Sequence, residues 1–272
     1  MLYLGIDLAW GEGSELKPAN RSGVAVLDSS GAIVDAGWTI GLDATVDWIQ
    51  RNARDDTVLF VDAPLVITNS AGARLADRQT GQCYGRWWVS ANSVNLNSSR
   101  RAGVRLRERL EALGWRYSDG REGPPASGRV LSECYPYTTI VGVPELGYDD
   151  KRPPYKRASK GTRAAEAWTT RIAACDDLIR RIVGLADFDP PVDLTSHPET
   201  KRLLEEPSPP RPRDYKQRED LLDAVICAWT AAYWHRYGLA RSQILGAPDD
   251  PGEWQLVATI VAPARPEQRR TP

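Results

Sequence analysis

Acidic side chains occur in this sequence at positions where apolar neighbours predict burial. Asp7 and Asp62 lie at the ends of two apolar runs, and Glu133 lies near the end of a third. The runs are residues 2–8, 57–61 and 129–136, and each has the length and composition of a buried strand. An ionised carboxylate in such a place costs several kcal/mol unless it is paired, hydrogen-bonded or bound to a metal. The pattern therefore indicates acids with a chemical or structural role.

A predicted helix at residues 218–234 carries two further acids. One side of this helix is large and apolar and the other is built of small residues, so nearly its whole surface suits burial. Asp220 and Asp223 lie three residues apart on the small-residue side. Two like charges oppose each other by up to about 4 kcal/mol at 4 Å and an effective dielectric of 20. A cation at this position would remove the repulsion.

Taken singly, most of these acids can have an ordinary structural role. Asp62 can belong to a turn before Ala-Pro, Glu133 can face solvent from an edge strand, and Asp220 can interact with the helix macrodipole. Asp223 lies too deep in its apolar helix to interact with the macrodipole. If the strand ends converge with the helix, their oxygen atoms form a site suited to Mg²⁺ or Mn²⁺.

The elements around these acids follow the order of an α/β domain with a mixed sheet and helices packed on it. We expect strands at 2–8, 23–28, 32–40, 57–61, 129–136 and 253–261, and helices at 43–51, 100–113, 163–183 and 218–234. A single domain is predicted for residues 1–264. Residues 66–128 form a mostly helical and loop insertion in it, and residues 265–272 are expected to be a frayed tail.

The composition is that of an ordinary globular chain. Of 272 residues, 42% are hydrophobic and 26% are charged, and the net charge is −1. The chain as a whole is therefore not a strongly basic nucleic-acid-binding protein, and binding to a polyanion requires local clusters of charge. No apolar run reaches the length of a membrane span and no signal peptide is recognisable. Four scattered cysteines and two histidines do not predict a zinc site, and we expect a cytoplasmic location.

The order of elements and the placing of the acids resemble the ribonuclease-H-like fold. The sequence from Asp220 to Ala224 (Asp-Leu-Leu-Asp-Ala) is similar to the final-helix motif of the Holliday-junction-resolvase branch. More closely, several motifs resemble a bacterial and archaeal family of unknown function that is described as predicted RNase-H-like nucleases. These motifs are Gly5-Ile6-Asp7, Val61-Asp62-Ala63-Pro64, Glu133-Cys-Tyr135-Pro136, Lys156…Gly161…Arg163 and Asp220-x-x-Asp223-Ala224. The resemblance covers most of residues 1–240 and implies a mixed five-stranded sheet with the insertion between strands four and five.

The resemblance also implies an activity, namely phosphodiester hydrolysis with two Mg²⁺ or Mn²⁺ ions on DNA or RNA. It implies Asp7 as the ligand shared by both ions, with Asp62 and Asp223 each holding one side. Asp220 and Glu133 are then accessory ligands or groups that orient water and metal. Ribonuclease H proper has a glutamate in its first helix, and Glu133 is the candidate to replace it here.

Basic and aromatic residues outside the acid set are candidates for contacts with nucleic acid. Arginines recur every four residues along one face of the helix at 100–113, and a basic, proline-broken loop follows at 149–161. Cations of this kind can bind phosphates, and aromatic rings can stack on bases, although a solvated surface accounts for the same charges. The predicted contacts are Arg101, Arg105, Lys156, Arg157, Lys160, Trp87 and Trp88, with Tyr155 as a further ring.

Two other classes of protein remain open from the sequence. Gly5-Ile6-Asp7 also begins sugar kinases and actin-like ATPases, but those enzymes need glycine-rich phosphate turns after the early strands. Here Leu8-Ala9-Trp10 follows, and no second Asp-Gly phosphate signal occurs at a strand end. A binding module that keeps the fold and the metal without catalysis satisfies the same acids. In either nuclease or module, Asp7, Asp62 and Asp223 should lie within reach of one metal site.

Overall fold

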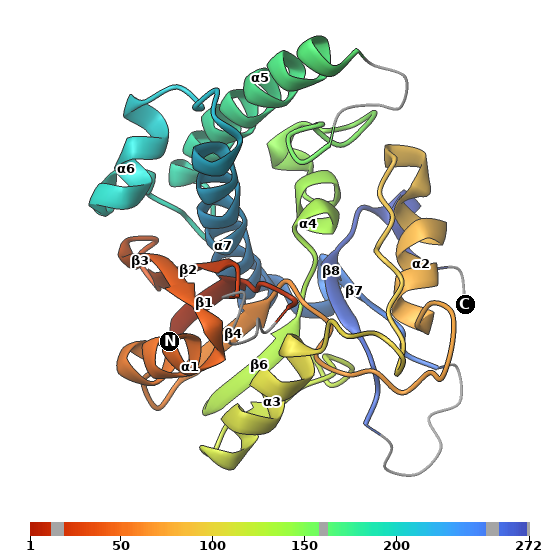
Figure 1. Cartoon of the computed structure of the whole chain (residues 1–272). Helices are drawn as coiled ribbons and strands as arrows, with labels where there is room; N and C mark the ends of the chain where they lie inside the picture. The colour runs from red at the N-terminus through yellow and green to blue at the C-terminus, as the bar shows by residue number, and fades with distance from the viewer. Residues whose placement is uncertain (12–18, 158–162, 249–255, 271–272) are drawn as a thin grey trace.

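The computed structural model describes residues 1–11, 19–157, 163–248 and 256–270. Its main feature is a six-stranded mixed sheet with the strand order β3-β2-β1-β4-β6-β5 (Figure 1). The strands are β1 (Leu2–Asp7), β2 (Arg21–Asp28), β3 (Ile33–Ile40), β4 (Thr57–Val61), β5 (Arg116–Tyr117) and β6 (Arg129–Glu133). β1, β2 and β3 pair antiparallel, whereas β1, β4, β6 and β5 pair parallel.

The sheet corrects the expected strand count by one. Five of its strands are the predicted ones, and the sixth is the two-residue strand β5 at the edge beside β6. β5 belongs to the segment 66–128 that was predicted as a helical and loop insertion. Two antiparallel strands, β7 (Ser242–Leu245) and β8 (Ile260–Pro263), form a second sheet, which packs beside β6 through β8. The predicted strand at 253–261 overlaps β8 only at its end, and residues 253–255 lie outside the described residues.

The central strands are buried on both faces, and each face has its own apolar core. Alternate residues of β1 and β4, such as Leu4 and Leu59, pack against helices α1 (Gly41–Asn52) and α3 (Ala102–Ala112). The intervening residues, such as Tyr3 and Phe60, pack on the opposite side against α7 (Pro212–Tyr237). This arrangement follows from the two-residue period of a strand. Because of this alternation, Asp7 at the end of β1 and Asp62 after β4 lie on the face of the sheet that α7 covers.

Helix α7 approaches the sheet at backbone contact distance. A Cβ atom added to Gly5 of β1 would lie 2.1 Å from the Ala224 carbonyl oxygen, and one added to Gly23 of β2 would lie 1.9 Å from that of Asp220. At Gly5 a glycine of the sheet thus meets the small residues Ala224 and Ala228 of α7. The helix is longer than the predicted 218–234 because it begins at Pro212, a residue favoured in the first turn of a helix.

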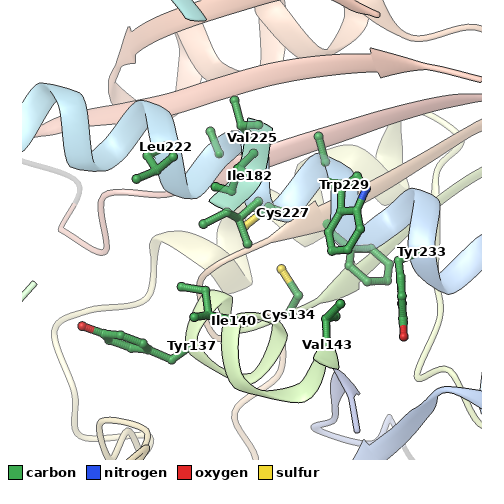
Figure 2. Packing of buried hydrophobic residues seen from close by; sticks show 14 of the residues in the cluster. Cys134, Tyr137, Ile140, Val143, Ile182, Leu222, Val225, Cys227, Trp229 and Tyr233 are labelled. Atoms are coloured by element: carbon green, nitrogen blue, oxygen red, sulfur yellow. The ribbon is translucent and has the colours of Figure 1, made fainter. Parts of the chain in front are cut away.

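The remaining helices surround this framework (Figure 1). They are α2 (Leu75–Tyr84), α4 (Pro136–Gly142), α5 (Ala164–Val183) and α6 (Pro198–Glu205), with short 3₁₀ turns at 85–87, 144–146, 184–187, 194–196, 238–240 and 266–268. Helix α2, which the polar composition of this region did not predict, packs beside β7. Figure 2 shows Ile140 and Val143, at α4, on the side toward α7, whereas Val225 of α7 lies beside Ile182 of α5. Among the described residues no helix combines the length and hydropathy that a membrane crossing requires.

The C-terminal segment is packed and not frayed over its described part, which corrects the prediction for 265–272. Arg265 is buried, and its guanidinium donates to the carbonyl of Val141 and pairs with Asp149 at 2.5 Å. Gln268 is also buried and donates to Val141 from its side-chain amide. A buried guanidinium needs several acceptors, and these contacts provide them. Residues 271–272 lie outside the described residues.

Candidate metal centre

Three of the predicted acids come together where the sheet meets α7. Oxygen atoms of Asp7, Asp62 and Asp223 all lie within 4.8 Å of one another. Asp7 ends β1, Asp62 follows the last residue of the parallel neighbour β4, and Asp223 lies on the helix that crosses both strands. The backbone N–H of Asp62 donates to the carbonyl of Ile6 and continues the ladder to the acid. The sequence-based prediction of one shared carboxylate site is confirmed in its geometry.

Strand periodicity explains why Asp7 and Asp62 point to α7. Tyr3, Gly5 and Asp7 share one face of β1, and Phe60 and Asp62 share the same face of the β4 segment. Gly5 lets α7 approach β1 closely at Ala224. The side chain of Asp223, the residue before Ala224, can therefore reach that face of the sheet. The carboxylate of Asp223 is fully buried, whereas Asp7 is only half-buried and Asp62 borders a cavity. The site is therefore closed to solvent at Asp223 and open to the cavity at Asp7 and Asp62.

A lysine of the chain lies among the three acids. The ammonium of Lys156 is 2.6 Å from Oδ2 of Asp223 and 3.5 Å from Oδ2 of Asp62. Asp223 also accepts a 2.6 Å hydrogen bond through Oδ1 from the hydroxyl of the buried Tyr155. Its Oδ2 is buried without a hydrogen-bond partner among the described residues, so the contact with Lys156 is an ion pair that lacks hydrogen-bond geometry. A metal ion that binds this oxygen must therefore displace the ammonium of Lys156.

Burial raises the pKa of each acid in the trio, and neighbouring carboxylates add to the rise. Desolvation is the main cause for all three, and Lys156 opposes it. The pKa of Asp7 lies well above its ordinary value, with the charges of Asp223 and Asp62 adding to the effect of burial. The pKa of Asp223 is raised to about 6. Burial acts to lower the pKa of Lys156, but Asp223 and the neighbouring anions outweigh it and raise that pKa. These are the environments in which a bound cation is most favourable.

The fourth predicted metal ligand, Asp220, lies beside the trio and not within it. Its carboxyl group is within hydrogen-bonding reach of Asp7. Burial raises the pKa of Asp220, and Lys216, whose ammonium is 2.6 Å from Oδ1, acts against this rise. Lys216 also pairs with the buried Glu219, which Arg171 contacts from the other side. Asp7 is consequently the acid that links the trio to this second charged group.

Glu133 is not part of the acid cluster, which corrects its predicted role as a catalytic group or metal accessory. It is paired in register with Val61, and so it lies on the α3 face of the sheet. Its two oxygens accept hydrogen bonds of 2.6 and 2.8 Å from the buried guanidinium of Arg74, and Oε2 also accepts one from the backbone N–H of Leu65. Arg74 pairs with Asp77 as well. Through its contact with Leu65, Glu133 therefore stabilises the turn that follows Asp62 from the α3 face of the sheet.

The residue beside Asp62 on the metal face is a cysteine. Cys134 follows Glu133, and its N–H donates to the carbonyl of Val61. Its buried thiol contacts that of Cys227 on α7, and Figure 2 shows both sulfur atoms among apolar side chains between α4 and α7. Burial raises the pKa of both thiols, so they remain protonated and apolar in character. The side of the acid trio that faces these two thiols is therefore apolar and excludes water.

A cavity of about 330 Å³ opens above the acids. Asp7, Asp62 and Asp220 form its acidic part. Many of the other lining side chains are basic or aromatic, namely Trp10, Arg21, Trp88, Tyr135, Tyr137, Arg152, Lys156, Arg157 and Lys216. Arg152 is held in place because it donates to the Tyr137 hydroxyl and lies 4.4 Å over the ring of that residue. The cavity combines groups for a cation with groups for an anion.

The predicted nucleic-acid contacts divide into three sets. Trp88, Lys156 and Arg157 line the cavity, although the ammonium of Lys156 is engaged with the acids. Arg101 and Arg105 lie at α3, outside the set of residues that line it. Two rings are corrected: Trp87 is 2% exposed and donates to the carbonyl of Asp149, and Tyr155 is fully buried, so neither can stack on a base in this conformation. Lys160 lies outside the described residues.

Fold and site together define an α/β protein with a buried carboxylate trio where a mixed sheet meets its longest described helix. The chain belongs to the family described as "Protein of unknown function (DUF429)", whose sequence model matches residues 5–251. No curated protein and no solved structure matches the chain.

Proposed function

We propose that this protein is a divalent-metal-dependent nuclease that hydrolyses phosphodiester bonds. The observation that carries the proposal is the trio of Asp7, Asp62 and Asp223, whose oxygens lie within 4.8 Å of one another at the floor of an open cavity. The buried Oδ2 of Asp223 already contacts a cation, the ammonium of Lys156 at 2.6 Å, and a metal ion would take its place. A set of carboxylate oxygens without histidine or thiolate ligands suits Mg²⁺ or Mn²⁺.

Each acid has a distinct place in this proposal. Asp7, Asp62 and Asp223 would hold one ion, and Asp7 with Asp220 would offer oxygens to a second. Divalent ions in such sites activate a water molecule and stabilise the leaving oxygen of a phosphodiester. The chain itself supplies a dry floor beneath the acids and fixes Asp223 through Tyr155. Exposed cations at the cavity, such as Arg21 and Arg157, are placed to bind substrate phosphates.

The test is a cleavage assay that is matched with a direct measurement of metal binding. Labelled single-stranded, duplex and junction substrates of DNA and RNA are incubated with Mg²⁺ or Mn²⁺ and wild type, Asp62→Asn or Asp223→Asn. Asp55→Asn is the matched control because it makes the same chemical change at a fully exposed carboxylate. We expect cleavage and Mn²⁺ binding by calorimetry in wild type and control, and loss of both in the two site variants. Cleavage that survives Asp223→Asn contradicts the proposal.

One observation favours a second candidate function, a binding module that does not cleave. The ammonium of Lys156 already neutralises part of the trio, so the fold does not need a metal ion to balance these charges. The two functions differ in the same assay. Metal binding by wild type together with no cleavage of any of the substrates favours the binding module.

A further inference from the structure

We propose that the cavity above the acids binds an unpaired nucleotide whose base stacks on Trp88, so that the substrate strand at this site is single-stranded. This inference rests on the proposed nuclease function and names its class of substrate. It begins from one side chain that is exposed where apolar rings are normally buried. The indole of Trp88 is 62% exposed and borders the same cavity as Asp7 and Asp62.

Trp88 is unusual among the large hydrophobic side chains. In the described part of the chain it is the most exposed of them, and the other strongly exposed ones are aliphatic. Its neighbour Trp87 is 2% exposed, so the two indoles of this turn have opposite environments. Exposed aromatic rings that line a groove with cations are the usual platforms for bases of single-stranded nucleic acids.

The backbone of Trp88 is held in a conformation that L-residues disfavour. Its φ is 64° and its ψ is 26°, and no other non-glycine residue of the described chain has a positive φ. Such conformations persist where surrounding contacts impose them, and they concentrate at binding and catalytic sites. Glycine or asparagine would suit this position better. A bulky indole here points to a task for the ring itself.

Several contacts fix the turn that presents the ring. The N–H of Trp88 donates to the Gly85 carbonyl at 2.9 Å, and its own carbonyl accepts from Nε of Arg152 at 2.8 Å. The N–H of Arg152 donates to the carbonyl of Trp87, whose buried indole donates to Asp149. Trp87 is therefore the anchor and Trp88 the presented ring. A ring on an ordered frame can stack without a large loss of conformational entropy.

The size and chemistry of the cavity fit one unpaired nucleotide. Its volume of about 330 Å³ lies at the small end of the range for ligand sites, which suits a single nucleotide unit. Bases inside a duplex have both faces covered by their neighbours, and only an unpaired base offers a free face to a protein ring. A base on Trp88 would place its phosphate in the part of the cavity that the acids and cations share.

The charges around the cavity agree with this placement. Five basic residues line the cavity, and two of them, Lys156 and Lys216, are paired with the acids. The other three, Arg21, Arg152 and Arg157, favour an anion at the side of the cavity away from those pairs. Arg21 and Arg157 are exposed and, among the described residues, have no acidic partner in an ion pair. They can bind phosphates on either side of the stacked nucleotide. Arg152 links the turn to the cavity, because its Nε donates to the Trp88 carbonyl and its side chain borders the cavity.

The experiment measures binding of fluorescein-labelled oligo-dT, oligo-rU and a duplex of equal length by fluorescence anisotropy, with Ca²⁺ in place of Mg²⁺. The full-length variants are Trp88→Ala, Trp88→Gly and Trp88→Phe. Leu113→Ala is the control because Leu113 is exposed and lies outside the residues that line the cavity. We expect tighter binding of the single strands than of the duplex. Trp88→Ala and Trp88→Gly should weaken single-strand binding about 5- to 150-fold, the usual effect of losing one stacked base. Trp88→Phe should retain most of it, and duplex binding should not change.

Trp88→Gly separates a binding role from a structural one. Glycine adopts φ of +64° without strain, so this variant should melt at or above the temperature of wild type while it loses single-strand affinity. A structural role for the indole would lower both quantities together. Single-strand affinity that stays at the wild-type level in Trp88→Gly, or equal losses for single strand and duplex, overturns the inference. Failure of the wild-type protein to bind any of the three probes also overturns the inference.

These outcomes are independent of the nuclease test. If oligo-dT binding depends on Trp88 but no substrate is cleaved, the proposed function fails and the nucleotide site stands. If wild type cleaves nucleic acid and the Trp88 variants bind and cleave like wild type, the nuclease stands and the nucleotide site is wrong.

Discussion

Replacement of Lys156 by methionine should strengthen metal binding and weaken the metal-free protein. The ammonium lies 2.6 Å from Asp223 and 3.5 Å from Asp62, and it competes with a metal ion for the same oxygens. At an effective dielectric of 20 these distances correspond to gross attractions of ~6 and ~5 kcal/mol. Desolvation cancels much of this, and loss of one partner from a buried ion pair typically costs about 3–5 kcal/mol. Lys156 is 19% exposed and Asp223 is fully buried, so the buried case applies.

The free energy of the contact between Lys156 and the acids should appear both in the metal affinity and in the stability of the metal-free protein. In wild type a metal ion must displace the ammonium, whereas in Lys156→Met it enters a trio that has no competing cation. A difference of about 3 kcal/mol corresponds to a Kd that is roughly 150-fold lower. In the metal-free variant the repelling acids should lower the melting temperature by about 6–12 °C, at 2–4 °C per kcal/mol for a chain of this size.

The assay is calorimetric titration with Mn²⁺ at pH 8, above the pKa of about 6 of Asp223, together with thermal melting in EDTA. Lys201→Met is the matched control because it removes the same charge from an exposed pair with Glu205. The control should change neither quantity, since exposed pairs contribute little. An unchanged Kd and an unchanged melting temperature in Lys156→Met would refute the competition. A weaker affinity would mean that Lys156 supports the metal.

Four further predictions test the acids and their supports. The pKa of Asp223 is raised from its ordinary value to about 6, so a proton competes with metal, and Mn²⁺ affinity should fall as pH decreases through about 6 in calorimetric titrations. In the metal-free protein this raised pKa contributes stability that is greatest below pH 4 and is lost as pH rises through about 6, so Asp223→Asn should gain in melting temperature over wild type across that window. Glu133→Gln should lower the free energy of unfolding by about 3 kcal/mol in urea titrations, because Arg74 loses a buried charge partner, while leaving Mn²⁺ affinity unchanged; a loss of affinity would return Glu133 to the metal centre. Gly5→Ala should cost at least ~1–3 kcal/mol and weaken Mn²⁺ binding because its Cβ would push α7 away, whereas Gly37→Ala, with no neighbour within 4 Å, should not weaken it.

The parts of the site that were predictable are those that lie on regular elements. An apolar strand that ends in an acid fixes where that acid lies along the sheet, and parallel neighbours bring such ends to one edge. Asp7 and Asp62 met both conditions. Asp223 was predictable because a charge within an otherwise apolar helix is costly unless a partner or a cation compensates it. The glycines that face α7 were consistent with the small residues of that helix, so local and tertiary patterns agreed.

Glu133 was misplaced because the sequence does not reveal which face of a fully buried strand each residue occupies. β4 and β6 are buried on both faces, and no alternation of polar and apolar residues marks the direction of the metal site. The deciding fact is the register, which pairs Glu133 with Val61 and leaves Cys134 beside Asp62. A shift of one residue moves every side chain to the other face. A motif match across the strand end therefore did not suffice to assign the glutamate.

Lys156 and Trp88 could not be placed because they lie in irregular segments whose positions depend on tertiary contacts. The sequence indicated that a cation should offset the repulsion between the acids of α7, and it suggested Lys156 as a phosphate contact. The structure joins the two observations, because the chain brings this ammonium to Asp223 from a loop that Tyr155 anchors. Tyr155 lies 68 residues before Asp223 and donates its own hydrogen bond to that acid. The acid trio is thus neutralised in part before any metal binds. It follows that the metal affinity of the site depends on where this lysine lies as much as on the three carboxylates, and that a contact moving Lys156 toward a substrate phosphate would raise that affinity.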